Sequence, residues 1–267
     1  QRRRPVDAAE APALFANSFP KSGTHLLTQV LAGFTRLGPF IETGLPAITM
    51  FDGVTGAARP LAELVGELNR LRPGDIGYGH LHAEPEILDA LCQPGTAPYF
   101  ILRDPRDVVV SHVFYVTDLA PNHALHAYYL QMEDFGERLK TSILGLPAVE
   151  FDFPDVRGRF LPYYGWLERP EVLTLHYEDF LSDRQTALRQ VLDHAIARGF
   201  QYQGEVQMAV KILSDAIDPQ RSPTFRSGRS GGWQQHFTPA HKELFKQVAG
   251  DLLIRLGYEQ DLSLIHI

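Results

Sequence analysis

The segment from Phe19 to His25 constrains the fold most strongly, because it joins a strand pattern directly to a helix pattern. An apolar run at 13–18 precedes it, and a helical pattern of apolar residues follows it. A tight loop between a buried strand and a helix directs backbone N–H groups and the positive end of the helix dipole at one point, which suits a phosphate or sulfate. Gly23 lets the backbone approach an anion closely, and Lys21 adds a positive charge. The sequence therefore predicts an anion-binding loop after the first strand.

This loop differs from the common nucleotide-triphosphate loop, because the pattern GxxxxGK[ST] is absent from the chain. Ser22 and Thr24 are also residue types that cap helices, and a capped strand-to-helix loop would have a similar sequence. The two interpretations, anion binding and helix capping, are compatible with each other.

Two further segments place arginine and glycine residues beside turns. The first, YFILRDPRDVVVS at 99–111, is an apolar strand pattern that ends at Arg103 and leads into a turn and a helix. The second, FRSGRSGGWQQHFT at 225–238, is a loop rich in glycine and arginine that precedes the C-terminal helix pattern. Both segments predict anion-binding positions in addition to the first loop.

In this combination the chain resembles the PAPS-dependent sulfotransferases. PKSGT is similar to their 5′-phosphosulfate loop, RDPRDVVVS to their 3′-phosphate motif, and RSGRSGGWxxxFT to their closing loop, RKGxxGDWxxxFT. The three motifs occur in the order of that family and together frame most of the chain. The resemblance implies an enzyme that transfers a sulfuryl group from PAPS to a hydroxyl or amine and releases 3′,5′-ADP. It also implies a P-loop-like α/β fold with a five-stranded parallel sheet.

The order of apolar patterns predicts the same fold class. Strand and helix patterns alternate, which favours a three-layer α/β fold with a central parallel sheet of about five strands flanked by helices. Ligands of such sheets bind beyond the carboxyl ends of the strands. The strand patterns lie at 13–18, 75–79, 98–103 and 171–176, and the helix patterns at 25–37, 60–71, 84–91, 182–198 and 239–256.

The resemblance assigns donor-binding roles to individual residues. Lys21 would lie near the bridging oxygen of the phosphosulfate and stabilise the leaving phosphate. Ser22, Gly23, Thr24 and His25 would donate hydrogen bonds to the 5′-phosphate. The remaining donor-binding residues are, for the 3′-phosphate, Arg103, Ser111, Arg226 and Gly228, and, for the adenine, Tyr177.

The arginine motif and the histidines each leave one alternative open. Arg103 could instead form a surface salt bridge, and Arg106 and Asp107 are expected to cap and pair on the helix. His80 in Gly79-His80-Leu81 matches the general base of the family, and an ordinary histidine pKa near 6.5 suits that role. His82 stays an alternative, because residues 80 and 82 of a regular strand face the same side.

The chain departs from the family pattern at three positions. Leu26 occupies the place where the cytosolic members have a tryptophan that stacks on adenine, Ser227 replaces a lysine, and Gly232 replaces an aspartate. Because of these departures, the resemblance gives less support to the residues assigned to the adenine and to the 3′-phosphate. They indicate a bacterial-type branch of the family.

Composition argues against several other classes of function. A net charge of −7 over 267 residues gives no support for nucleic-acid binding, and one cysteine, Cys92, allows neither an intrachain disulfide nor a CxxC metal site. We expect that the protein needs no metal and that it is located in the cytoplasm. The acceptor would be a small-molecule, glycan or lipid-like hydroxyl compound. A nucleotide kinase or NTPase of related fold, and a non-catalytic nucleotide-binding module, stay as alternatives.

Both ends of the chain carry separate expectations. Residues 1–11, which begin QRRRP, are expected to form a disordered tail, and 12–261 a single sulfotransferase domain. The last six residues, LSLIHI at 262–267, match the translation of a transposon adapter used in sequencing-library preparation, so we exclude them from fold reasoning.

Overall fold

The computed structural model describes residues 11–146, 152–222 and 228–261, which form two compact units. Unit 1 contains 11–50, 59–102 and 163–222; unit 2 contains 51–58, 103–146, 152–162 and 228–261. The expected adapter translation, and the expected tail apart from Ala11, lie outside the described residues. The extent of the single domain expected at 12–261 stays a prediction.

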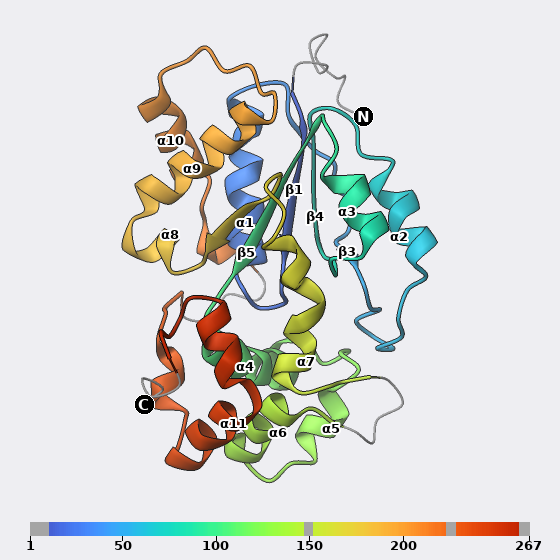
Figure 1. Ribbon diagram of the computed structural model, residues 1–267, viewed down its shortest axis with the longest axis vertical. Helices are drawn as coiled ribbons and strands as arrows, with labels where there is room; N and C mark the ends of the chain where they lie inside the picture. Colours follow the sequence, from blue (N-terminus) through green and yellow to red (C-terminus); the bar gives the residue numbers. More distant parts are fainter. Residues whose placement is uncertain (1–10, 147–151, 223–227, 262–267) are drawn as a thin grey trace. The chain divides into compact units, whose positions relative to one another are not determined.

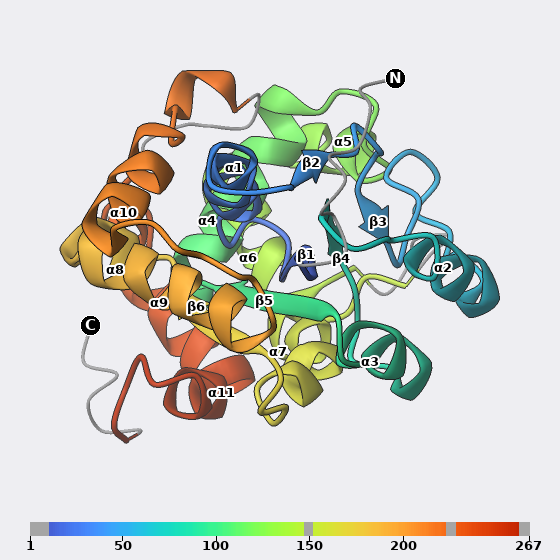
Figure 2. The ribbon, with the colours of Figure 1, turned by 90° about the horizontal axis from the view of Figure 1, so that it is seen from above.

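A parallel sheet forms the centre of unit 1 (Figures 1 and 2). It has six strands in the order β2-β4-β1-β5-β6, with β3 also paired to β4, and every pairing between them is parallel. The strands are β1 (Ala13–Ser18), β2 (Ile41–Glu42), β3 (Ile48–Thr49), β4 (Asp75–His80), β5 (Thr96–Leu102) and β6 (Leu173–His176). The fold class predicted from the sequence is therefore confirmed.

Alternation along β1 divides the core of unit 1 between the two faces of the sheet. Leu14 and Ala16 belong to a large apolar cluster together with residues of four helices, α1, α8, α9 and α10, which cover one face. Phe15 points to the other face, where its ring lies 3.0 and 3.2 Å from the positions that Cβ atoms on Gly77 and Gly79 would occupy, closer than ordinary van der Waals contact. That alternation is the period of two expected of a strand, and both of its faces are buried, as in parallel sheets.

Helices α2 and α3 lie on the other side of the sheet from α1 (Figures 1 and 2). On that face the ring of Phe100 stacks with those of Tyr163 and Trp166, at centroid distances of 6.1 and 6.4 Å. The helices of unit 1 are α1 (Thr24–Ala32), α2 (Leu61–Leu68), α3 (Pro85–Leu91), α8 (Asp179–Ser182), α9 (Arg184–Ala197) and α10 (Val206–Asp215), with 3₁₀ turns at Gly33–Arg36 and Pro219–Arg221.

Unit 2 is helical. Its longest helix, α11, packs against α6 and α7, and α6 also packs against α4. The elements are α4 (Pro105–Phe114), a π-helical turn (Tyr115–Leu119), α5 (His126–Leu130), α6 (Phe135–Leu144), α7 (Val156–Phe160), a 3₁₀ turn (Gly232–Gln235) and α11 (Pro239–Arg255). A further 3₁₀ turn, Leu161–Trp166, runs from unit 2 into unit 1.

Candidate active site

The loop between β1 and α1 contains two residues with a positive φ, a backbone conformation that favours glycine. Lys21 has a φ of 71° and is the one non-glycine residue with a positive φ among the described residues. Gly23 has a φ of 106° and is the N-cap residue of α1. A Cβ on Gly23 would lie 2.7 Å from Cδ2 of Tyr177, so a larger residue would clash as well as strain the backbone. Strained backbone of this kind, about 1–3 kcal/mol per residue, is concentrated at functional sites.

Ser22 and Thr24 do not cap the helix, so the capping interpretation is wrong. The N-cap residue is Gly23, and no side chain of the described residues caps α1 by a hydrogen bond. The Ser22 hydroxyl is buried and has no hydrogen-bond partner among the described residues. The Thr24 hydroxyl lies 2.6 Å from the Ser18 hydroxyl. The first N–H groups of a helix have no partner within it, so this loop offers backbone donors, a buried hydroxyl and the Lys21 side chain to an anion.

His80, the last residue of β4, is hydrogen-bonded to the end of β1. Its Nδ1 lies 3.0 Å from the Ser18 carbonyl oxygen and 3.1 Å from the Ser18 hydroxyl. Because a carbonyl oxygen can only accept, the proton in this contact belongs to Nδ1. The imidazole is then the tautomer whose Nε2 has a free lone pair. Sequence reasoning chose His80 for its place at a strand end, and the structure brings it to the strand that leads into the anion loop.

Burial lowers the pKa of His80 to about 4, and the positive charges of Lys21 and His25 act in the same direction, whereas the Ser18 carbonyl opposes them. His25 itself has a lowered pKa, first because of burial and then because of Lys21. The lowered pKa means that the His80 imidazole is neutral at pH 7. A neutral imidazole can accept a proton, which a general base requires.

His82 has a different environment. Its ring makes an edge-to-face contact with Tyr163, with centroids 4.9 Å apart, and burial lowers its pKa to about 4. Leu81, between the two histidines, is fully buried. The two histidines therefore come from one short segment but contact different neighbours.

Asn17 holds this segment in place, and sequence reasoning missed it. The Leu81 N–H donates to Asn17 Oδ1 at 2.8 Å, and Asn17 Nδ2 donates to the Leu81 carbonyl at 2.9 Å. Trp166 Nε1 donates to the same carbonyl at 2.8 Å. A fully buried asparagine in the otherwise apolar run ALFAN was the available signal, because buried amides occur where they are hydrogen-bonded.

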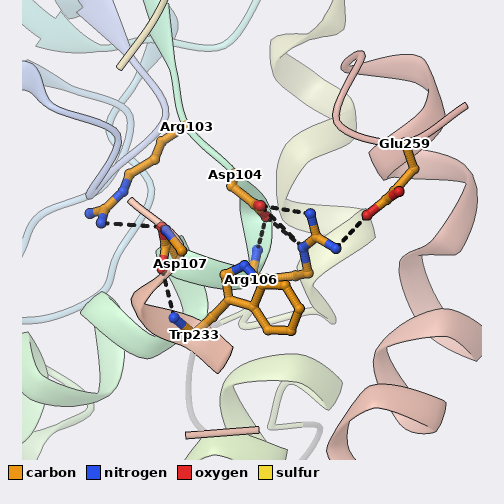
Figure 3. A network of polar contacts seen from close by, with 7 residues as sticks. Arg103, Asp104, Arg106, Asp107, Trp233 and Glu259 are labelled. Atoms are coloured by element: carbon orange, nitrogen blue, oxygen red, sulfur yellow. Dashed lines mark hydrogen bonds and ion pairs between the residues drawn. The ribbon is translucent and has the colours of Figure 1, made fainter. Parts of the chain in front are cut away.

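In unit 2, Arg103 lies at the start of a buried network of polar groups (Figure 3). Its Nη2 donates to the Arg229 carbonyl at 2.8 Å and lies 3.5 Å from Asp107 Oδ2. Asp107 also accepts from the backbone N–H groups of Gly231 and Trp233, at 2.8 and 2.9 Å. Two of the sequence motifs are thus joined by one carboxylate. Burial raises the pKa of Asp107, and the charge of Arg103 opposes that rise.

The expected capping role of Asp107 is wrong, because Asp104 fills it. The Asp104 carboxylate accepts from the backbone N–H of Arg106 at 2.9 Å, so it caps α4. The guanidinium of Arg106 pairs with Asp104 at 2.8 Å and with Glu259 at 2.6 Å, and it lies 4.3 Å from the centroid of the Trp233 ring. The expected pairing of Arg106 is confirmed, although its partners include a residue far along the chain.

The other expected donor-binding residues are distributed as follows. Ser111 lies half-buried on α4, and Gly228 follows a part of the chain outside the described residues. Arg226 falls within that part. Tyr177 follows β6, donates its N–H to the Leu102 carbonyl and packs against Gly23 of the anion loop. No group of three or more His, Cys, Asp or Glu side chains that could hold a metal occurs within 11–146, 152–222 and 228–261. Over the same ranges, no helix has both the length and the apolar character needed to cross a membrane.

Known sequences relate this chain to sulfotransferases. It is 24% identical to rat sulfotransferase 2A2 over 86% of this chain and 80% of the rat protein. It is 21% identical to rat sulfotransferase 1 family member D1, over 88% and 81%. A mouse relative, sulfotransferase 2A6, is 26% identical over 58% of this chain, and the match spans about half of the mouse protein, 55% of its length. No family model matches the chain.

Solved structures share the fold. A mouse sulfotransferase complexed with PAP superposes with a TM-score of 0.62 at 20% identity, over 91% of this chain and 84% of that one. This chain is a relative of the sulfotransferases. A second neighbour, retinol dehydratase in complex with androsterone and the inactive cofactor PAP, has a TM-score of 0.61 at 16% identity, over 90% and 80%. The resemblance to sulfotransferases that the motifs predicted therefore agrees with the sequence relatives and with the shared fold.

Proposed function

We propose that this sulfotransferase relative moves a sulfuryl group from PAPS to a hydroxyl or amine of an acceptor and releases 3′,5′-ADP. The observation that carries the proposal is the joining of His80 to the strand that leads into the anion loop. A phosphosulfate-type anion loop and a neutral imidazole with a free Nε2 are the two groups that such a transfer needs. The relatives named above support the reaction class.

The donor is bound by the two groups of motif residues. Backbone N–H groups and hydroxyls of Ser22, Gly23, Thr24 and His25 bind the 5′-phosphate, and the buried, unpaired Ser22 hydroxyl gives this assignment a structural basis. Arg103 and Ser111 bind the 3′-phosphate, assisted by Arg226 and Gly228. Tyr177 contacts the adenine, in keeping with its position over Gly23.

The transfer is an in-line displacement. The acceptor oxygen attacks sulfur as its proton passes to Nε2 of His80, while the bond between sulfur and the bridging phosphate oxygen breaks. Lys21 stabilises the negative charge that develops on the departing phosphate. The bound donor also brings negative charge close to Lys21 and His25, whose positive fields lower the pKa of His80. Donor binding therefore raises the basicity of His80.

The acceptor belongs to the small-molecule, glycan or lipid-like hydroxyl compounds. Retinol dehydratase, a structural relative, forms complexes with androsterone and with retinol, which are two apolar alcohols. As further parts of this proposal, the reaction requires no metal and takes place in the cytoplasm. Addition of EDTA to the assay and fractionation of the host cell test these two points.

The decisive experiment is a screen of PAPS consumption against a panel of hydroxylated and amino acceptors, with the mass of each product measured. A gain of one sulfuryl group identifies both the reaction and the acceptor class. In parallel, 3′,5′-ADP should raise the melting temperature, and adenosine should not, because it lacks both phosphates. Equal shifts from 3′,5′-ADP and from ATP with Mg²⁺ would instead favour a nucleotide kinase or NTPase.

Variants at the two histidines test the base. His80→Ala should lower turnover by about 10²–10⁴-fold and leave the affinity for 3′,5′-ADP nearly intact, because the base contacts the acceptor. His82→Ala, the matched variant two residues away, should retain much of the activity. A dead His82→Ala with a nearly normal His80→Ala would reverse the assignment. Substantial turnover in both would remove histidine from the mechanism, with Glu84 the nearest carboxylate in the sequence.

A further inference from the structure

A short chain of hydrogen bonds joins His80 to the anion loop. It runs from His80 Nδ1 to the carbonyl and hydroxyl oxygens of Ser18, at 3.0 and 3.1 Å, and from the Ser18 hydroxyl to the Thr24 hydroxyl, at 2.6 Å. Ser18 is fully buried and Thr24 is 8% exposed, so water competes little for these contacts. The three residues come from β1, α1 and β4, all of them in unit 1.

The donors and acceptors in this chain can be assigned. The Ser18 carbonyl fixes the proton on Nδ1, so the Ser18 hydroxyl can only accept from that atom. The Ser18 hydroxyl can then donate its own proton to Thr24, its other partner within hydrogen-bond distance. The proton of the Thr24 hydroxyl is left for a further acceptor, and Thr24 is the first residue of α1, where an anion in the loop would lie. In the reverse order Nδ1 would have no proton, and two lone pairs would face each other at 3.0 Å.

We propose that Ser18 is a positioning residue that couples donor binding to the base. It holds His80 with Nε2 free and orients the Thr24 hydroxyl toward the anion in the loop. This inference rests on the proposed function. An anion that accepts from Thr24 turns the Thr24 proton toward the loop, so the Ser18 hydroxyl donates to Thr24 and keeps its lone pairs for the Nδ1 proton of His80. By linkage, a stronger contact at Nδ1 in turn favours the occupied loop.

Coupling of this kind has a signature that a purely structural serine would not give. An acceptor on the Nδ1 proton stabilises the imidazolium that forms during transfer, so its loss lowers the pKa of His80. The other charged or titratable groups that act on His80 are Lys21 and His25, and they stay in place when Ser18 changes. The acidic limb of the kcat profile, where His80 becomes protonated, should therefore move to lower pH in Ser18→Ala.

Three variants make the test. Ser18→Ala removes the hydroxyl and keeps the carbonyl; it should lower kcat by about tenfold, the effect of one hydrogen bond, and weaken 3′,5′-ADP binding several-fold. Ser18→Thr keeps the hydroxyl and should restore both quantities. Ser182→Ala is the matched control, because its exposed hydroxyl donates to the Glu178 carbonyl within the same unit. It should leave kcat, the pH profile and 3′,5′-ADP binding unchanged.

A measurement on the wild-type protein avoids dependence on variant folding. Nitrogen-15 NMR of the imidazoles, with His80 assigned by comparison with His80→Gln, should find the proton of neutral His80 on Nδ1, with and without 3′,5′-ADP. A proton on Nε2 would overturn the inference, as would a Ser18→Ala variant that melts normally and matches the wild type in kcat, pH profile and affinity. A wild-type protein that neither binds 3′,5′-ADP nor transfers a sulfuryl group would overturn the proposed function itself. The two failures are thus distinguishable.

Discussion

The anion loop of unit 1 and the arginine network of unit 2 hold their functional groups by different physical means. In unit 1 the holding groups are neutral: the backbone of the loop, the hydroxyls of Ser18 and Thr24, and the amide of Asn17. In unit 2 they are charged: Asp107 beside Arg103, and Asp104 and Glu259 around Arg106 (Figure 3).

This difference has a physical consequence for each region. Neutral hydrogen bonds fix the directions of donors and acceptors around the anion loop without adding a charge of their own. The carboxylates of unit 2 instead offset part of the arginine charge and hold the loop at 228–233 by its backbone. A cation that only binds the donor can keep a carboxylate as its neighbour. A cation that stabilises charge developing in the transition state would be less effective beside a carboxylate, because the carboxylate offsets its charge. The comparison therefore predicts that substitutions in the anion loop of unit 1 lower kcat most, and that substitutions in the arginine network of unit 2 mainly lower nucleotide affinity.

The largest effect should follow removal of the loop's cation. Lys21→Met should lower kcat by about 10²–10³-fold, the usual loss when one group that stabilises transition-state charge is removed. The affinity for 3′,5′-ADP should fall much less, because the other donors of the loop stay. Single-turnover rates and calorimetric titration measure the two quantities. Lys211→Met on α10, which removes a lysine with an exposed i,i+4 partner, is the control. Equal losses of rate and affinity would contradict a catalytic role for Lys21.

The two regions should respond to acid in opposite directions. The pKa values of His80 and His82 are lowered from 6.5 to about 4, so the stability that their neutral forms provide is present above pH 6.5 and is lost as the pH falls toward 4. The shift of the fully buried His80 corresponds to about 3 kcal/mol, and that of the partly exposed His82 to less, because solvent screens it. The pKa of Asp107 is raised by burial, so the contribution of this carboxyl group to the stability of the folded protein increases as the pH falls.

Hydrogen exchange at pH 7 and pH 5, corrected for intrinsic rates, checks this contrast. Peptides that cover 75–82 should lose protection at pH 5, and peptides that cover 228–233 should not lose it through Asp107. His82→Gln should remove part of the loss at 75–82, because the amide does not titrate. Equal loss of protection in both regions would mean that acid acts on the whole molecule and that the histidines do not control it.

The third expected effect concerns the carboxylate that joins two motifs in unit 2. Asp107→Asn removes the charge beside Arg103 and one of two strong acceptors, so it should lower the free energy of unfolding by about 2 kcal/mol. The preference for 3′,5′-ADP over 5′-AMP should also fall, because Arg103 and the loop at 228–233 lose their common partner. Calorimetric titration with both nucleotides and urea unfolding measure these effects.

Asp134→Asn is the matched control for Asp107→Asn. Asp134 caps α6 from an exposed position in the same unit, and asparagine caps helices about as well. The nucleotide preference of this control should equal that of the wild type. A preference that survives Asp107→Asn unchanged would show that the loop holds its position without the carboxylate.

The sequence predicted the elements whose patterns are long and one-sided. The strands β1, β4, β5 and β6 and the helices α1, α2, α3, α9 and α11 agree with the expected ranges to within a few residues. The strands β2 and β3 were not predicted, because two residues carry no periodicity and pair with β4 only through contacts distant in the chain.

Site prediction succeeded for local motifs and failed for tertiary partners. The loop around Gly23 and the strand-end position of His80 could be found because each depends on a few adjacent residues. The assignment of Asp107 as a helix cap failed, because Asp104 and Asp107 flank the same helix start and only contacts with residues 231–233 distinguish them. The roles proposed for Ser111, Tyr177, Arg226 and Gly228 stay predictions.

The smallest effect should come from the far end of the unit 2 network. Glu259→Gln removes a carboxylate 2.6 Å from Arg106 Nη1, but Arg106 keeps its contacts to Asp104 and the ring of Trp233. The free energy of unfolding should therefore fall by about 1 kcal/mol or less. Glu137→Gln, which removes an exposed partner of Lys140 in the same unit, should have almost no effect.

The nucleotide preference of Glu259→Gln should stay at the wild-type value, because Glu259 acts on Arg106 and not on Arg103. If Glu259→Gln lowered that preference as much as Asp107→Asn does, the two halves of Figure 3 would act as one network, and charge around Arg106 would take part in holding the loop at 228–233.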